Sequence, residues 1–154
     1  MPRNMDNSNP RLLLSEILRK VSNAKTKKEK VDLLRKHNSN ALRQLLIINF
    51  DESIESVMPE GDVPYNPNEA PAGTEHTRLA KEYKGLFRFV KGGQDNLPVL
   101  KRESMFVQLL EGLHESEAEV ICLVKDKKLQ KKYRITKSVV QEAFPQIVWG
   151  KNRS

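Results

Sequence analysis

The chain has 154 residues, with 27 lysines and arginines against 20 aspartates and glutamates, which gives a formal net charge of +7. This length fits one domain with a buried core. The charge favours a polyanionic partner, although charge alone does not separate nucleic acid from an anionic membrane surface. No apolar run approaches the roughly 20 residues that span a bilayer.

The N-terminal sequence and the cysteine content suggest a cellular compartment. The first ten residues, MPRNMDNSNP, lack the apolar region of a signal peptide. Cys122 is the only cysteine, which excludes an intrachain disulfide and a CxxC-type metal site. We therefore expect a cytoplasmic protein.

Residues 9–57 are predicted to form three helices after a mobile tail of residues 1–8. Asn9 and Pro10 are a typical helix start. Thr26 with Glu29 predicts a capping box at the second helix, and Ser39 predicts the start of the third. Taken alone, the basic residues of these helices indicate a solvated surface: Arg19, Lys20, Lys25, Lys27, Lys28, Lys30, Arg35 and Lys36.

Residues 58–73 are predicted to form an acidic, proline-rich loop. Between residues 51 and 75 every charged residue is acidic, and four prolines with two glycines disfavour regular structure. The loop could bind a partner or compete with DNA for the basic surface, but a simple connector is the better-supported interpretation. We expect deletion of residues 60–72 to leave the fold intact.

Residues 74–150 complete a single helical domain that spans residues 9–150. Thr74 is predicted to cap one helix, which ends at Gly92–Gly93. Pro98 begins the next helix, whose apolar residues make it the expected centre of the fold: Met105, Phe106, Leu109, Leu110 and Leu113. Strand signals are absent, so the sequence predicts an all-α fold of about seven helices in two halves.

A basic loop between two predicted helices is the main candidate site. Ser116 with Glu119 predicts the first helix start, Thr136 caps the second helix, and Pro145 ends it. Lysines in such a loop repel one another unless an anion lies across them, so the loop is either a nucleic-acid contact or a solvated surface. Tyr133 could lie there against a sugar or base. The basic residues are Lys125, Lys127, Lys128, Lys131, Lys132, Arg134 and Lys137.

The sequence offers no catalytic or metal-binding pattern. The three histidines lack ligand-like spacing, and neither HExxH nor a glycine-rich phosphate loop occurs. The acidic cluster of Glu115, Glu117 and Glu119 is explained better by a solvated helix end than by metal binding. We therefore expect a protein without enzymatic activity, cofactor, metal or small-molecule substrate.

Two segments carry a resemblance to a known family. LLLSEILRKVSNAKTKKEKVDLLRKHNSNALRQLL and FVQLLEGLHESEAEVICLVKDKKL…ITKSVVQEAFPQI resemble the start and end of the N-terminal helical DNA-binding domain of phage-type ATP-dependent DNA ligases. The chain is also similar to short uncharacterised proteins of T4-like tailed phages, cyanophages among them. The K-x-D-G lysine motif of adenylyl transfer does not occur in this chain.

The resemblance implies a module that contacts the minor-groove face and the phosphates of duplex DNA, in the host cytoplasm if a phage encodes it. The positions that match the family are Lys27, Lys36, Asn40, Lys125, Asp126, Arg134, Thr136 and Ser138. The ligase loop is shorter and carries a glycine near the place of Arg134, so we expect side-chain phosphate contacts here in place of a close backbone approach.

The function predicted from these features is that of a non-enzymatic accessory protein for DNA replication or repair, with weak sequence specificity. Its predicted DNA-binding residues are Lys27, Lys28, Lys36, Asn40, Lys125, Lys127, Lys128, Lys131, Lys132, Tyr133, Arg134, Thr136, Lys137 and Ser138. The alternative is an adaptor that docks on a replication, recombination or host transcription protein through its acidic loop.

Overall fold

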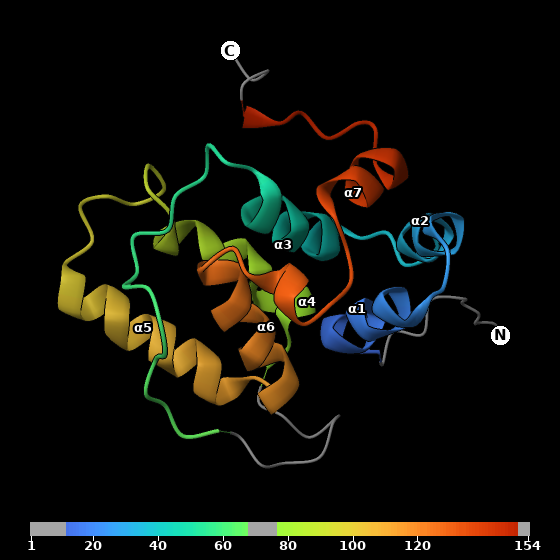
Figure 1. Cartoon of the computed structure of the whole chain (residues 1–154). Helices are drawn as coiled ribbons and strands as arrows, with labels where there is room; N and C mark the ends of the chain where they lie inside the picture. The colour runs from blue at the N-terminus through green and yellow to red at the C-terminus, as the bar shows by residue number, and fades with distance from the viewer. Residues whose placement is uncertain (1–11, 68–76, 151–154) are drawn as a thin grey trace, which may run out of the picture.

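The computed structural model describes residues 12–67 and 77–150, and these confirm the all-α fold (Figure 1). An isolated antiparallel bridge pairs Ser56 with Val90. The α-helices are α1 (Leu14–Asn23), α2 (Lys27–Lys36), α3 (Asn40–Phe50), α4 (Leu79–Glu82), α5 (Val99–Gly112), α6 (Glu115–Lys125) and α7 (Lys137–Ala143). The 3-10 helices named among the described residues are η2 (Tyr83–Phe89) and η3 (Leu129–Lys131).

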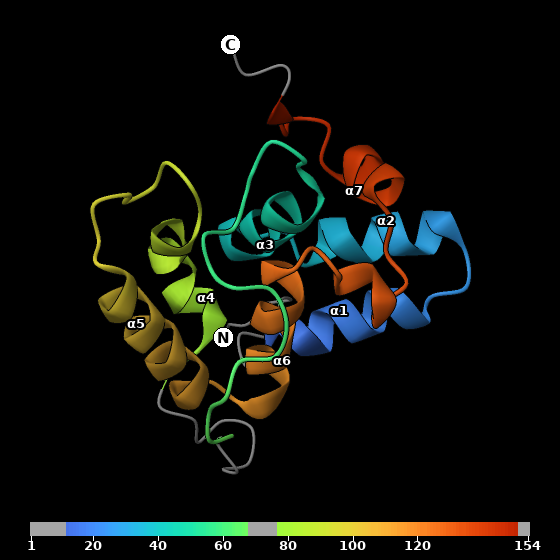
Figure 2. The same ribbon diagram turned by 60° about the vertical axis from the view of Figure 1, so that its left-hand side comes forward.

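The centre of the fold is α6, and the prediction that α5 occupies it is wrong. Helix α6 contacts α1, α3 and α5, whereas α5 lies at the edge of the molecule (Figure 2). The Leu100 side chain at the start of α5 is 80% exposed. Helix α5 contains more apolar residues than α6, but they spread around its circumference. Only Arg102, Phe106 and Leu110 of α5 are buried.

The structure confirms three of the predicted helix caps. The Thr26 side chain accepts from the Glu29 backbone N–H and completes the capping box of α2. Ser39 and Thr136 cap α3 and α7 by the same kind of bond. These caps depend on neighbours three residues away, which is why the sequence alone predicts them.

The predicted cap at Ser116 is wrong, because α6 begins earlier. Its N-cap is His114, whose Nδ1 accepts from the Ser116 backbone N–H at 3.1 Å. The Ser116 hydroxyl instead lies 2.7 Å from that of Ser15 on α1, and Glu119 pairs with Lys132. Ser116 and Glu119, which the local sequence pattern pairs with each other, therefore both bind residues from other parts of the chain.

Other predicted helix limits also change. The tail of residues 1–8, the start signal at Asn9 and Pro10, and the cap at Thr74 lie outside the described residues. In place of one α-helix reaching Gly92–Gly93, the four residues of α4 are followed by η2, which ends at Phe89. Pro98 precedes α5 as its N-cap, one position earlier than a first-turn proline.

The described part of the acidic segment packs against the core. Met58 is buried, and Val63 and Tyr65 are half-buried against the core. The Gly61 backbone N–H donates to the Asp126 carboxylate at 3.1 Å, and that of Asn66 donates to Glu111 at 2.9 Å. The prediction that deleting residues 60–72 leaves the fold intact stays a prediction, although such a deletion would remove these contacts; residues 68–76 lie outside the description.

The two predicted halves form one packed unit. Helix α7, from the end of the chain, packs against α2, near its start (Figures 1 and 2). The Arg35 side chain fixes this contact by donating to the backbone carbonyl groups of Glu142 and Ala143 at 2.8 Å and 3.2 Å.

Glu117 is a fully buried carboxylate that joins three helices. From α6 it accepts the backbone N–H of Leu14 at 2.9 Å and that of Leu79 at 3.1 Å. These donors are the first residues of α1 and α4, where N–H groups lack partners within the helix and the helix dipole favours a negative charge. The prediction of a solvated acidic helix end is wrong at this residue.

We expect Glu117→Gln to lower the free energy of unfolding by about 2–4 kcal/mol, since an amide gives the two helix starts one acceptor oxygen instead of a carboxylate. Glu115→Gln, at an exposed position two residues earlier, is the control and should change stability by less than about 0.5 kcal/mol. Urea unfolding of both variants measures the difference. Equal stabilities would contradict the role assigned to Glu117.

Candidate nucleic-acid interface

The packing of α2 against the end of the chain brings distant basic residues together. Lys27 Nζ donates to Ser138 Oγ at 2.7 Å and lies 3.4 Å from the Glu142 carboxylate. The Arg134 backbone N–H donates to the Ser22 hydroxyl at 2.9 Å, and Lys30 Nζ donates to the Arg134 carbonyl oxygen. Arg134 is therefore fixed beside α2, although more than 100 residues separate it from Lys30.

A solvent-open groove of about 390 Å³ lies between these segments; we call it the α2–α7 groove. It lies where two capped helices begin, because Thr26 and Thr136, the N-caps of α2 and α7, both line it. None of its lining residues is acidic. They are Lys25, Thr26, Lys27, Lys30, Gln130, Arg134, Ile135, Thr136 and Val139.

Lys30 and Arg134, two of the groove's cations, lie close enough to affect each other. Burial lowers the pKa of Lys30, and the nearby Arg134 guanidinium lowers it further. Lys25 and Arg134 are exposed, and neither forms an ion pair within the described part of the chain. No carboxylate is among the lining residues, and within the described residues the one ion pair made by a lining cation joins Lys27 to Glu142 at 3.4 Å.

The side chains of three predicted contact residues are buried or are bound to groups within the protein. Tyr133 is 2% exposed, so its ring cannot stack on a base in this conformation. The Lys125 side chain is also 2% exposed and donates to the carbonyl oxygens of Pro59 and Gly61 at 2.7 Å and 3.1 Å. Lys127 donates to the carbonyl oxygens of Ile48 and Asp51 at 2.6 Å and 2.8 Å. Burial of Tyr133 and Lys125 and the carbonyl partners of Lys127 do not favour the predicted contacts of these residues with DNA in this conformation.

Four further predicted residues lie at the surface with a partner. Lys28 pairs with Asp32 at 2.9 Å, Lys128 with Glu60 at 3.6 Å, and Lys132 with Glu119. The Lys137 ammonium lies 4.9 Å from the centre of the Trp149 ring. Because exposed ion pairs are weak, Lys28, Lys128 and Lys132 can still exchange their carboxylate partners for a phosphate.

The remaining predicted residues lie on or near the α2–α7 groove or are exposed elsewhere. Lys27, Arg134 and Thr136 line it, and Ser138 holds Lys27. Lys36 and Lys131 are exposed. Asn40 accepts a hydrogen bond from Arg43 and is not among the groove's lining residues.

Sequence reasoning assigned Lys25 and Lys30 to a solvated helix face, whereas both line the groove. The signal that could have found them is their position around the Thr26 cap. Residues on either side of an N-cap lie at the helix start, where the dipole favours anions.

One protein-family model matches this chain. The model of a family of unknown function, DUF6433, matches residues 17–131, which is more than half of the chain. The chain belongs to DUF6433. This match runs from α1 to the end of η3, so it includes the lysines of α2 and most of the basic loop and stops before Arg134.

Two other comparisons found no similar protein. No curated protein matches the chain, and no solved structure matches it. The resemblance to DNA ligase N-terminal domains therefore stays a prediction.

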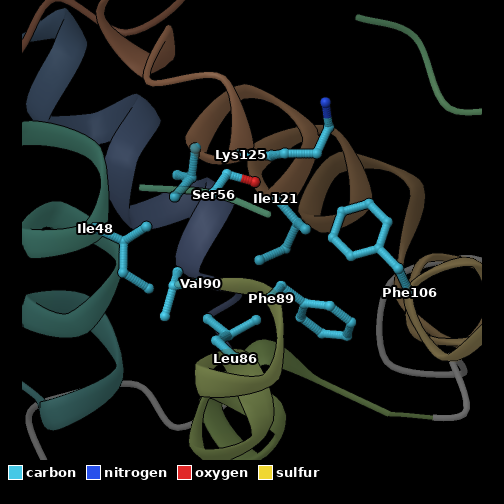
Figure 3. Close-up of a pocket in the computed structure, with 9 residues that line it drawn as sticks. Ile48, Ser56, Leu86, Phe89, Val90, Phe106, Ile121 and Lys125 are labelled. Carbon is cyan, nitrogen blue, oxygen red and sulfur yellow. The ribbon is translucent and has the colours of Figure 1, made fainter. Parts of the chain in front are cut away.

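A second cavity, among α3, η2, α5 and α6, belongs to the core (Figure 3). Its volume is about 30 Å³, and most of its lining is apolar, including Ile48, Phe89 and Phe106. The Lys125 amine points away from it (Figure 3), and the Ser56 hydroxyl already accepts from the Met58 backbone N–H. A water molecule would lack the two to four polar partners that it needs, so the cavity is a packing gap rather than a ligand site.

The described residues contain neither a metal-ligand cluster nor a membrane-spanning helix. Among residues 12–67 and 77–150, no three His, Cys, Asp or Glu side chains are grouped so that they could hold a metal ion. No helix in these ranges combines the length and apolar character needed to cross a bilayer. Burial raises the pKa of the Cys122 thiol to about 11, which disfavours a reactive thiolate.

We expect Lys125→Gln to destabilise the fold by about 1–3 kcal/mol, because it leaves the Pro59 and Gly61 carbonyl oxygens without their buried donor. Affinity for DNA should stay within about twofold, since the amine does not reach the surface. Thermal unfolding and a fluorescence-anisotropy binding assay measure the two effects. A large loss of affinity at unchanged stability would restore Lys125 to the interface.

Proposed function

We propose that this protein is a non-enzymatic, duplex-DNA-binding accessory protein that contacts phosphates through the face formed by α2, η3 and α7. The observation that supports the proposal is the α2–α7 groove, which joins Lys25, Lys27, Lys30 and Arg134 without an acidic residue in its lining. Neutralising phosphates releases condensed counterions, and this supplies affinity that does not depend on base sequence.

Backbone contact is favoured over base contact by the side chains available on this face. Stacking on single strands needs exposed aromatic rings, but Tyr133 is buried and Lys137 lies over Trp149. Base reading in the major groove needs Arg, Asn or Gln side chains aligned on one recognition helix. Helix α2 instead carries lysines at its start, with the sequence KKEKVDLLRK. These features favour duplex over single-stranded DNA and predict weak sequence specificity.

The dependence of affinity on salt tests the phosphate contacts. If four to six cationic side chains replace counterions, a plot of log K against log salt should have a slope of about −4 to −5. Anisotropy titrations of one duplex at several salt concentrations measure the slope. A flat response, or a strong preference for one base sequence, would contradict phosphate-led binding.

A pair of charge-matched variants tests the location of the interface. Lys25→Glu, Lys131→Glu and Arg134→Glu together should weaken duplex binding by about 100-fold or more, because they remove cations and add repulsion at one place. The control is Lys84→Glu, Lys91→Glu and Lys101→Glu, which makes the same charge change around η2 and α5. These are at the other side of the molecule (Figure 1).

The six positions are exposed, so both triple variants should keep the parent's melting temperature within a few degrees. Only the first variant should lose binding beyond the loss that the change in net charge causes in the control. Equal losses would mean that net charge, rather than this face, attracts DNA.

A role as an adaptor is the second candidate, and exposed apolar residues favour it. Val99 and Leu100 at the start of α5 are 63% and 80% exposed, and Phe87 is 45% exposed. The packed residues of the acidic segment fit this role less well than α5 does. Purification at low salt separates the candidates, since a DNA binder carries nucleic acid with excess absorbance at 260 nm.

A further inference from the structure

Positive side chains approach the α2–α7 groove from both of its sides. Lys25, Lys27 and Lys30 come from the start of α2 and the turn before it, and Arg134 comes from the segment that leads into α7. Gln130 adds an amide to the same lining. The groove therefore offers many N–H donors and positive charge to a ligand rich in oxygen atoms.

The two threonines of the groove each keep a proton that a ligand can accept. Thr26 Oγ1 accepts from the Glu29 backbone N–H at 3.1 Å, and Thr136 Oγ1 accepts from that of Val139 at 3.3 Å. A hydroxyl has two acceptor lone pairs and one donor proton, so capping a helix leaves the proton available. Both hydroxyls can thus donate into the groove.

Arg134 is held beside Lys30 by its backbone rather than by attraction between the side chains. The Ser22 hydroxyl and the Lys30 ammonium fix the backbone of Arg134. Burial lowers the pKa of Lys30, and the like charge of Arg134 lowers it further. An anion bound between Lys30 and Arg134 would attract both cations and so offset their mutual repulsion.

We infer that the α2–α7 groove holds one phosphate group and that it favours a terminal phosphate monoester over an internal diester. The inference rests on the proposed binding of duplex DNA and identifies the end of a phosphorylated strand as the preferred ligand. A monoester carries a charge of about −1.5 to −2 at pH 7 and three strong acceptor oxygens, whereas a diester carries about −1. Four cations and two hydroxyl donors match the monoester better, and the Lys27 ammonium would exchange its exposed Glu142 partner for the phosphate.

The test compares one duplex with a 5′-phosphate and the same duplex with a 5′-hydroxyl, at equal ionic strength. The protein should bind the phosphorylated duplex about five- to tenfold more tightly, from the additional charge in the groove. Arg134→Gln should remove this preference, and Lys25→Gln should reduce it. Lys101→Gln, on α5, is the control and should keep it.

Inorganic phosphate provides a second and independent measurement. In NMR titrations, phosphate but not chloride at equal ionic strength should shift the backbone amide signals of Thr26 and Thr136 in the parent protein. The same titration of Arg134→Gln should show smaller shifts. The Arg134 side chain is exposed, and the hydrogen bonds to Ser22 and Lys30 involve the Arg134 backbone. The variant should therefore remain folded.

The outcomes separate this inference from the proposed function. Equal affinity for the two duplexes, with no phosphate shifts, would overturn the phosphate site and leave duplex binding in place. Phosphate shifts without affinity for either duplex would support the site and contradict the DNA-binding function. A preference that survives in both Arg134→Gln and Lys25→Gln would show that the groove is not its source.

Discussion

The buried carboxylate of Glu117 is the interaction on which the arrangement of the helices depends. It stands on the central helix α6 and accepts backbone N–H groups from the first residues of α1 and α4. A buried charge is costly unless it is fully hydrogen-bonded, so this carboxylate favours one relative placement of the three helices. Because α1 leads directly into α2, the same contact also helps to fix the position of the basic face.

A second constraint divides the positive charge of the loop after α6 between two roles. Lys125 and Lys127 turn inward and bind carbonyl oxygens of residues 48–61, and Lys128 pairs with Glu60. The acidic segment is thus the internal partner of the first part of the loop. Arg134, nearer α7, is bound by Ser22 of α1 and Lys30 of α2 instead, so the exposed positive charge of the loop collects on one side.

Local interactions explain which features the sequence could predict. The caps at Thr26, Ser39 and Thr136 involve residues three positions apart, and each has the predicted bond. The helical class also follows from periodicity, which each segment carries alone. The centre of the fold was not predictable in this way, because the apolar content of α5 does not reveal how many neighbours cover it.

The candidate site could be predicted only in part, for the same reason. Lys125 and Arg134 are nine positions apart in a basic stretch, and nothing local distinguishes the buried one from the exposed one. Their difference comes from the backbone carbonyl groups near residue 60, which reach Lys125, and from Ser22, which reaches the backbone of Arg134. Tyr133 lies beside Arg134 in sequence, yet its large apolar ring is buried where a cation is not.

The partners chosen by the cations of the α2–α7 face decide how strong its field can be. Lys30 and Arg35 donate to the backbone carbonyl groups of Arg134, Glu142 and Ala143, and these are neutral acceptors. A carbonyl oxygen satisfies an N–H donor without cancelling its charge, whereas the carboxylates that pair with Lys128 and Lys132 cancel theirs. These bonds therefore leave the charges of Lys30 and Arg35 uncancelled, whereas Lys27 and Lys28 on the same helix pair with Glu142 and Asp32. An anion in the groove would leave the bonds of Arg35 in place, but it would compete with the contacts that Lys27 makes to Ser138 and Glu142.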